Sequence, residues 1–139
     1  MIKHSMLNAH MNQLAACLGH TDEVTIADAG LPVPAGVQRI DLALTHGIPG
    51  FLQTVRVWLA SCQVDAVVLA GEFATQSPEL HQALLAELEL ESRRCGRDIP
   101  VTYLTHDAFK QRTANSRAII RTGECTPFAN VIFQSGVTF

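Results

Sequence analysis

Residues 66–104 read AVVLAGEFATQSPELHQALLAELELESRRCGRDIPVTYL and indicate a strand, a helix and a second strand in succession. The short, continuous apolar run at 66–70 is typical of a strand buried on both faces. Ser77-Pro78-Glu79 predicts a helix start, with Pro in the first turn and an acid near the positive end of the helix dipole. This helix is expected to run to about Cys95, and Pro100–Leu104 then predicts a second strand. A strand–helix–strand unit of this kind favours a parallel sheet.

The rest of the chain repeats this alternation of strands and helices. Expected strands cover residues 23–27, 39–44, 117–121 and 130–134, and expected helices run from Asn8 to Leu18, onward from Pro49, and over 107–114. No repeat, low-complexity tract or long linker marks a domain boundary. We therefore expect a single α/β domain over residues 1–139 with three layers, a mainly parallel sheet of about six strands flanked by helices.

The composition points to a globular protein with an unusually uncharged surface. Hydrophobic residues make up 47% of the 139 residues and charged residues 17%, so some apolar surface is expected to be covered by other subunits. The net charge is -3 and the densest basic spot, Arg93-Arg94 with Arg97, is expected at a solvated helix end, which argues against nucleic-acid binding. No apolar run reaches the ~18 residues that span a bilayer, and no apolar leader opens the chain. We expect no membrane partner and a cytoplasmic location.

Neither the cysteines nor the histidines are spaced as metal ligands. The four cysteines include no CxxC pair, and no HExxH or HxH motif occurs. Cys17 and Cys62 fall within apolar helical patterns and are expected in the core. A structural role is expected for Cys125, and no disulfide framework is expected. We therefore expect no metal site.

Polar side chains follow several of the expected strands, at the end where parallel sheets bind ligands. Asp28 comes directly after the strand 23–27, and Thr105-His106 follows the strand 100–104. If these strands are parallel, Asp28 and His106 share one edge of the sheet. His20 precedes its strand instead. It therefore lies at the other end of that strand or reaches the site across a subunit boundary, and the sequence leaves both arrangements open.

Imidazole and carboxylate groups suit proton transfer near neutral pH. His20 follows a helix end, which favours a cation and suits a proton donor, although the ring could equally cap the helix. Asp28 could hold a polar substrate or simply bind the backbone amides of a turn. His106 could act on a substrate or be an incidental loop residue beside Asp107, with Asp107 as the helix N-cap. The remaining histidines have no supporting context and are expected on the surface: His4, His10, His46 and His81.

The segment Arg121–Asn130, RTGECTPFAN, is a polar loop between two apolar strands. Its Gly and Pro restrict the backbone, its Thr, Glu and Asn offer hydrogen bonds, and Phe128 offers a flat apolar face. Such a mixture suits a sugar, which has polar edges and apolar C–H faces. The alternative is an ordinary loop whose Phe128 is tucked into the core.

Six segments carry a family resemblance: LGHTD (18–22), DAGLP (28–32), RIDLALT (39–45), YLTHDAF (103–109), RTGEC (121–125) and GVTF (136–139). Together, in this order and over nearly the whole chain, they resemble the D-ribose pyranase family, which also contains L-fucose mutarotase. The resemblance implies an isomerase that interconverts β-D-ribopyranose and β-D-ribofuranose, with D-ribose as its substrate.

The same resemblance implies roles for individual residues. It makes His20 the proton donor and places Asp28, His106 and the segment of Phe128, Ala129 and Asn130 against the sugar. Such a reaction moves only protons and ring bonds, so we expect neither a redox cofactor nor a metal. The resemblance also implies ring-shaped homo-oligomers, two pentamers stacked into a decamer, with sites between neighbouring subunits.

One position departs from the family pattern. The family usually has Tyr-Ala-Asn or Tyr-Gly-Asn where this chain has Phe128-Ala129-Asn130. Phe128 keeps a stacking face but lacks a hydroxyl, and one lost hydrogen bond is worth about 0.5–1.5 kcal/mol. Two other functions stay open at this point. One is a mutarotase for another monosaccharide such as L-fucose, and the other is a non-catalytic sugar-binding protein associated with transport.

Overall fold

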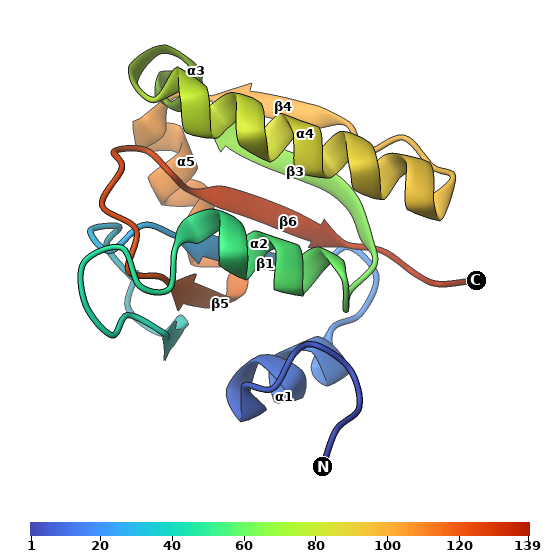
Figure 1. Cartoon of the computed structure of the whole chain (residues 1–139). Coiled ribbons are helices and arrows are strands. Elements are labelled where there is room, and N and C mark those ends of the chain that lie inside the picture. Colours follow the sequence, from blue (N-terminus) through green and yellow to red (C-terminus); the bar gives the residue numbers. More distant parts are fainter.

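The computed structural model describes residues 1–139, in which strands and helices alternate along most of the chain (Figure 1). The strands are β1 (Glu23–Ala27), β2 (Gln38–Asp41), β3 (Val64–Ala70), β4 (Val101–Leu104), β5 (Ser116–Arg121) and β6 (Val131–Ser135). The helices are α1 (Ala9–Cys17), α2 (Phe51–Leu59), α3 (Gly71–Gln76), α4 (Pro78–Cys95) and α5 (His106–Arg112), followed by the short 3₁₀ turn η1 (Thr113–Asn115).

All six strands form one sheet in the order β2-β5-β1-β6-β3-β4. Pairing is parallel between β1 and β5, β2 and β5, and β3 and β4, whereas β6 is antiparallel to both of its neighbours, β1 and β3. The direction of β6 follows from its connection, because a parallel return to the sheet needs a longer crossover than the helix-free loop 122–130 provides. The expected mainly parallel sheet of about six strands is confirmed.

The sheet is buried on both faces, which gives the domain its three layers. Along β3, Val67 and Leu69 belong to the core cluster that also contains residues of α2 and α4, while Val68 and Ala70 belong to a second cluster that contains Phe109 of α5. Figure 1 shows α2 and α4 on the near face of the sheet and α5 on the far face. A strand covered on both sides explains the continuous apolar run at 66–70.

Local signals located the ends of α4 correctly. Pro78 occupies the first turn, and Gly96 ends the helix in the left-handed conformation with φ of 67°. The expected N-cap of α5 was wrong, because the Thr105 side chain accepts the bond from the Ala108 backbone N–H at 3.2 Å. Asp107 lies inside the first turn and pairs with Lys110 at 2.9 Å. His106 is therefore the first residue of the helix and not an incidental loop residue.

Three other expectations can be compared with the packing. Cys62 lies against the larger core cluster, where burial raises the pKa of its thiol to about 12. Cys17 was expected in the core but is exposed, because α1 buries only the stripe of Met11 and Leu14. His81 was expected on the surface but is 5% exposed, with its Nε2 2.8 Å from the Tyr103 hydroxyl. The packing of α4 over the edge strand β4 covers it, which its own sequence context does not reveal.

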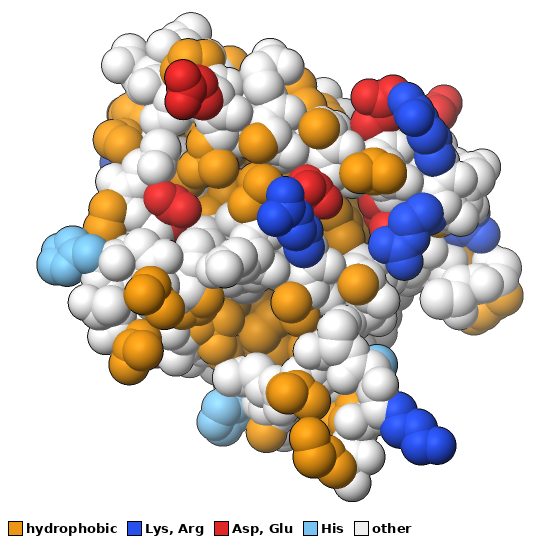
Figure 2. Space-filling model, viewed as in Figure 1, with side chains coloured by type: hydrophobic (Ala, Val, Ile, Leu, Met, Phe, Trp, Pro, Cys, Tyr) orange, Lys and Arg blue, Asp and Glu red, His pale blue; other side chains and the backbone are white.

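Charged side chains cluster over one part of the face drawn in Figure 2. Figure 2 shows Lys, Arg, Asp and Glu side chains gathered over the C-terminal half of α4, where Arg93 and Arg94 stand in the last turn as expected. Large hydrophobic side chains are exposed elsewhere, among them Leu44, Ile48 and Phe139. No helix of this chain has both the length and the apolar character that crossing a bilayer requires.

Candidate active site

Most of the candidate residues lie at one edge of the sheet. Asp28 follows β1 and His106 follows β4, so these two lie where parallel strands end, as expected. Because β6 runs the other way, the segment 128–130 that leads into it starts from the same edge. The antiparallel strand thus brings Asn130 beside the end of β1, although the two are 102 positions apart in the chain.

Two hydrogen bonds with Asn130 hold Asp28 in place. The Asn130 side-chain oxygen accepts the Asp28 backbone N–H at 2.8 Å, and its amide nitrogen donates to Asp28 Oδ2 at 2.9 Å. The other carboxylate oxygen accepts the Gly30 N–H at 2.9 Å, so the turn role considered from the sequence is present as well. Asn130 is 1% exposed, whereas Asp28 is half-buried. The carboxylate is therefore fixed in direction while it still faces solvent.

His106 stands between two aromatic rings at the start of α5. Its ring lies parallel to that of Phe109 at a centroid distance of 6.5 Å and perpendicular to that of Phe128 at 4.9 Å. The His106 backbone N–H donates to Glu72 Oε2 at 2.9 Å, and this bond is the main reason why the pKa of Glu72 is lowered. His106 Nδ1 is buried without a hydrogen-bond partner. Buried polar atoms are normally paired, so this nitrogen is an unsatisfied group next to the aromatic rings.

The loop before β6 holds Phe128 in an uncommon backbone conformation. Phe128 has φ of 63°, a left-handed conformation that costs a residue with a side chain roughly 1–2 kcal/mol. The Ser77 hydroxyl donates to the Pro127 carbonyl at 2.7 Å and helps to hold the loop, and Ala129 is fully buried. Phe128 is half-buried, touching both the larger core cluster and His106. Strain of this kind is concentrated at ligand sites in proteins.

Glu124 anchors the first part of the same loop. Its carboxylate accepts the Phe51 N–H at 3.1 Å, at the start of α2, and the Thr126 hydroxyl at 2.8 Å. Burial raises the pKa of Glu124, but these hydrogen bonds outweigh it and the pKa is lowered. The carboxylate therefore stays ionised where it ties α2 to the loop.

His20 lies at the opposite edge of the sheet from Asp28. It precedes β1 while Asp28 follows it, and five residues of strand alone extend about 16 Å. The structure places His20 at the far end of its own strand. Its ring is exposed, and Nε2 lies 3.1 Å from Asp65 Oδ2 at the start of β3. Within one chain, His20 and Asp28 cannot touch the same monosaccharide.

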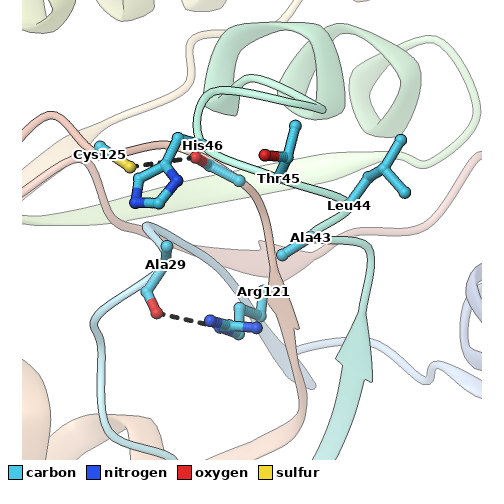
Figure 3. A pocket seen from close by; sticks show the side chains of 8 residues that line it. Ala29, Ala43, Leu44, Thr45, His46, Arg121 and Cys125 are labelled. Carbon is cyan, nitrogen blue, oxygen red and sulfur yellow. Dashed lines mark hydrogen bonds between the residues drawn. The ribbon is translucent and has the colours of Figure 1, made fainter.

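A cavity of about 270 Å³ opens beside the Asp28 turn but does not contain the candidate residues. Its lining includes Ala29, His46, Arg121 and Cys125 (Figure 3). Arg121 donates to the Ala29 carbonyl at 3.0 Å and pairs with Asp41 at 3.0 Å, so it ties this turn to β2. Neither Asp28 nor His106 lines the cavity.

The structure pairs three acidic residues with the candidate residues or their loop, and the sequence indicated none of these partners. Glu72 binds the His106 backbone, Glu124 holds the 124–128 loop, and Asp65 meets His20. Glu72 had a usable signal, since it comes just after a buried strand. Asp65 had none, because its partner lies 45 positions away. No group of three or more His, Cys, Asp or Glu side chains is arranged to hold a metal ion.

Comparison with known proteins places the chain in a family. A family model described as the RbsD / FucU transport protein family matches residues 1–138. The chain belongs to this family. Among curated relatives, a protein of Shewanella pealeana named D-ribose pyranase is 68% identical, and one of Vibrio cholerae with the same name is 60% identical. Both alignments cover all of this chain and all of the relative.

Solved structures of family members share the fold. Bacillus subtilis RbsD, determined in complex with D-ribose, is 42% identical with a TM-score of 0.90, and the match covers all of both chains. The fucose mutarotase of Streptococcus pneumoniae, determined with L-fucose, is 21% identical with a TM-score of 0.68, and the match covers 94% of each chain. The second likeness shows a common fold and no more.

Proposed function

We propose that this chain is a D-ribose pyranase, an isomerase that interconverts β-D-ribopyranose and β-D-ribofuranose. The observation that carries the proposal is the 68% identity, over the full length of both chains, with a relative of that name. The site agrees with a sugar ligand, because Asn130 fixes the direction of the Asp28 carboxylate and the imidazole of His106 lies 4.9 Å from the apolar ring of Phe128.

In the proposed reaction, His20 donates a proton to the ring oxygen of ribopyranose. A base removes the proton of the anomeric hydroxyl, and the C1–O5 bond breaks to give the open-chain aldehyde. The base is either His106 or a water held by Asp28. The C4 hydroxyl then attacks C1 and loses its proton, while O1 regains one, which closes the furanose ring. Proton transfer by each positioned group contributes typically ~10²–10⁴-fold.

We also propose that a second copy of the chain supplies His20. The support is geometric, because His20 and Asp28 of one chain lie at opposite edges of the sheet. Exposed apolar side chains such as Leu44, Ile48 and Phe139 are suited to subunit contacts. The proposed assembly is a decamer of two pentameric rings. Light scattering should then give ten times the chain mass of 15.1 kDa, or 151 kDa, and a monomer would refute the shared site.

The composite site can be tested by mixing two inactive variants. His20→Ala and Asp28→Ala should each abolish acceleration of ring exchange, measured by NMR saturation transfer on D-ribose. In a shared site, His20 comes from one chain and Asp28 from its neighbour. When the two variants are co-expressed in equal amounts, about a quarter of the sites should have both residues intact and should be active. No recovery in mixed assemblies of normal size would overturn the composite site.

The same assay tests the substrate and the enzyme class. Wild-type protein should accelerate exchange of D-ribose ring forms, and acceleration of L-fucose exchange alone would reassign the chain as a mutarotase for that sugar. Binding of ribose without acceleration beyond that of His20→Ala would instead indicate a sugar-binding protein. We place the enzyme in the cytoplasm, where its four free cysteines stay reduced, and cell fractionation tests this.

A further inference from the structure

Asp65 contacts the histidine that the proposed reaction uses as its acid. The distance between His20 Nε2 and Asp65 Oδ2 is 3.1 Å. We propose that Asp65 is a positioning residue that fixes the orientation and tautomer of His20, so that Nδ1 is the ring nitrogen presented to the sugar. This inference rests on the proposed function, and four features of the fold support it.

The first feature is an irregularity of β3 at Asp65. In the pairing of β3 with β6, Val64 lies opposite Ser135 and Ala66 lies opposite Gln134, with a register shift between them. Asp65 is therefore the extra residue of a β-bulge, with no residue opposite it. Bulges turn a side chain out of the regular alternation and are over-represented next to active sites.

The second feature is the space left for the carboxylate by Gly136. A Cβ atom at Gly136 would lie 2.0 Å from Asp65 Oδ1, which is closer than two non-bonded atoms can approach. Gly136 is not among the glycines with positive φ, so an alanine could adopt this backbone. The glycine is needed here for room and not for conformational freedom.

The third feature is the rigid turn that carries His20. The Thr21 N–H donates to the Ser135 carbonyl at 2.9 Å, and the Ser135 N–H donates to the Asp22 carbonyl at 2.7 Å. Thr21 has φ of 70°, an uncommon conformation for a β-branched residue. The turn is thus tied to the end of β6, directly before the glycine that makes room for Asp65.

The fourth feature is a cation on the other side of the carboxylate. Arg97 lies 4.0 Å from Asp65 Oδ1, while its guanidinium also donates to the Val137 carbonyl at 3.1 Å. Oδ1 faces the guanidinium and Oδ2 faces the imidazole. Exposed ion pairs add little to stability, so this arrangement is better explained by orientation than by folding free energy.

The contact has a defined consequence for the proton transfer. The protonated ring carries hydrogens on both nitrogens, and Nε2–H is bonded to Asp65. When Nδ1–H passes its proton to the ring oxygen of the sugar, the ring is left as the Nε2–H tautomer, which is the form that Asp65 accepts. The next proton returns to Nδ1, so the ring need not rotate between the two halves of the reaction.

The test compares Asp65→Asn with a matched control, Asp98→Asn. Asp98 is exposed and lies near the start of β4, at the same edge of the sheet. Asp65→Asn should lower kcat for ribose ring exchange by ~10–100-fold with little change in KM, as is typical when the partner of a functional histidine is lost. Asp98→Asn should leave both constants unchanged, and Asp65→Glu should restore part of kcat. A wild-type kcat in Asp65→Asn would overturn the inference.

Gly136→Ala supplies a second, independent variant. It should lower kcat like Asp65→Asn, because the new methyl group displaces the carboxylate. In an Asp65→Ala background the space is free, so adding Gly136→Ala should cause no further loss. An equal additional loss in that background would show that Gly136 acts in some way other than through Asp65.

A nitrogen-15 NMR measurement of the His20 ring separates this inference from the proposed function. Above neutral pH the ring should be the Nε2–H tautomer in the wild type and a mixture of tautomers in Asp65→Asn. The same tautomer distribution in both proteins would overturn the positioning role, whatever the enzyme does. If the wild type fails to accelerate ribose exchange while the tautomer depends on Asp65, the proposed function is wrong but the positioning of His20 by Asp65 is supported.

Discussion

Replacing Asn130 with alanine should loosen the candidate site, because Asn130 holds both the backbone and the carboxylate of Asp28. The change removes one hydrogen bond to the Asp28 backbone, at 2.8 Å, and one to its carboxylate, at 2.9 Å. A neutral hydrogen bond contributes about 0.5–1.5 kcal/mol and one to a charged group about 1.5–3 kcal/mol. Asn130→Ala should therefore lower the free energy of unfolding by roughly 2–4 kcal/mol.

Thermal unfolding and ring exchange measure the two effects separately. For a domain of this size, the loss corresponds to a fall in Tm of about 6–15 °C. Asp28 keeps only its bond to Gly30, so its carboxylate should turn away from the sugar and kcat/KM for ribose should fall by about 10–100-fold. Asn115→Ala, at an exposed position of η1, is the matched control and should change neither quantity. A variant at Asn130 with wild-type Tm and wild-type kcat/KM would refute the role given to this pair.

Three further predictions concern the neighbouring residues. Phe128→Tyr should raise kcat/KM for ribose about 2–10-fold, the worth of one added hydrogen bond, and a lower value in the NMR exchange assay would count against a sugar contact there. Burial lowers the pKa of His81 below its ordinary 6.5, so the unfolded chain binds the extra proton first and stability falls as the pH drops below about 6.5. In urea titrations at several pH values, His81→Gln should flatten that fall, and an unchanged slope would contradict it. Glu124 has a lowered pKa, so its contribution is complete above its ordinary 4.5 and lost as the pH falls through the lowered value. The Glu124→Gln variant should thus be less stable than the wild type at neutral pH, and this difference in the free energy of unfolding should disappear in acid.

Segments with strong local signals could be predicted closely. The buried run in β3, the Pro78 start and Gly96 end of α4, and five of the six strands follow from apolar patterning and from residues that favour helix ends. The strand expected over 39–44 was too long, because β2 ends at Asp41 and three of its four residues are exposed. Helix α3 was not predicted, because it begins directly after β3 and contains only six residues. A helix this short buries a single side chain, Phe73, and therefore leaves no periodic pattern.

Burial and pairing were harder to predict, because they depend on what packs against each element. His81 is buried only because α3 and β4 supply Phe73 and Tyr103 around it. Cys17 is exposed only because α1 meets the rest of the protein along a narrow stripe. Neither arrangement can be derived from the residues near each position in the chain.

The sequence by itself determined the fold class, the family and the chemical types of the candidate site residues, because these depend on local patterning and on the order of motifs. Tertiary structure alone decided which of those residues meet. Strand β6 runs antiparallel and so brings Asn130 to Asp28, while the bulge at Asp65 turns a carboxylate toward His20. The physical reason is that these contacts join positions 102 and 45 residues apart, and only the direction and register of paired strands place such positions side by side.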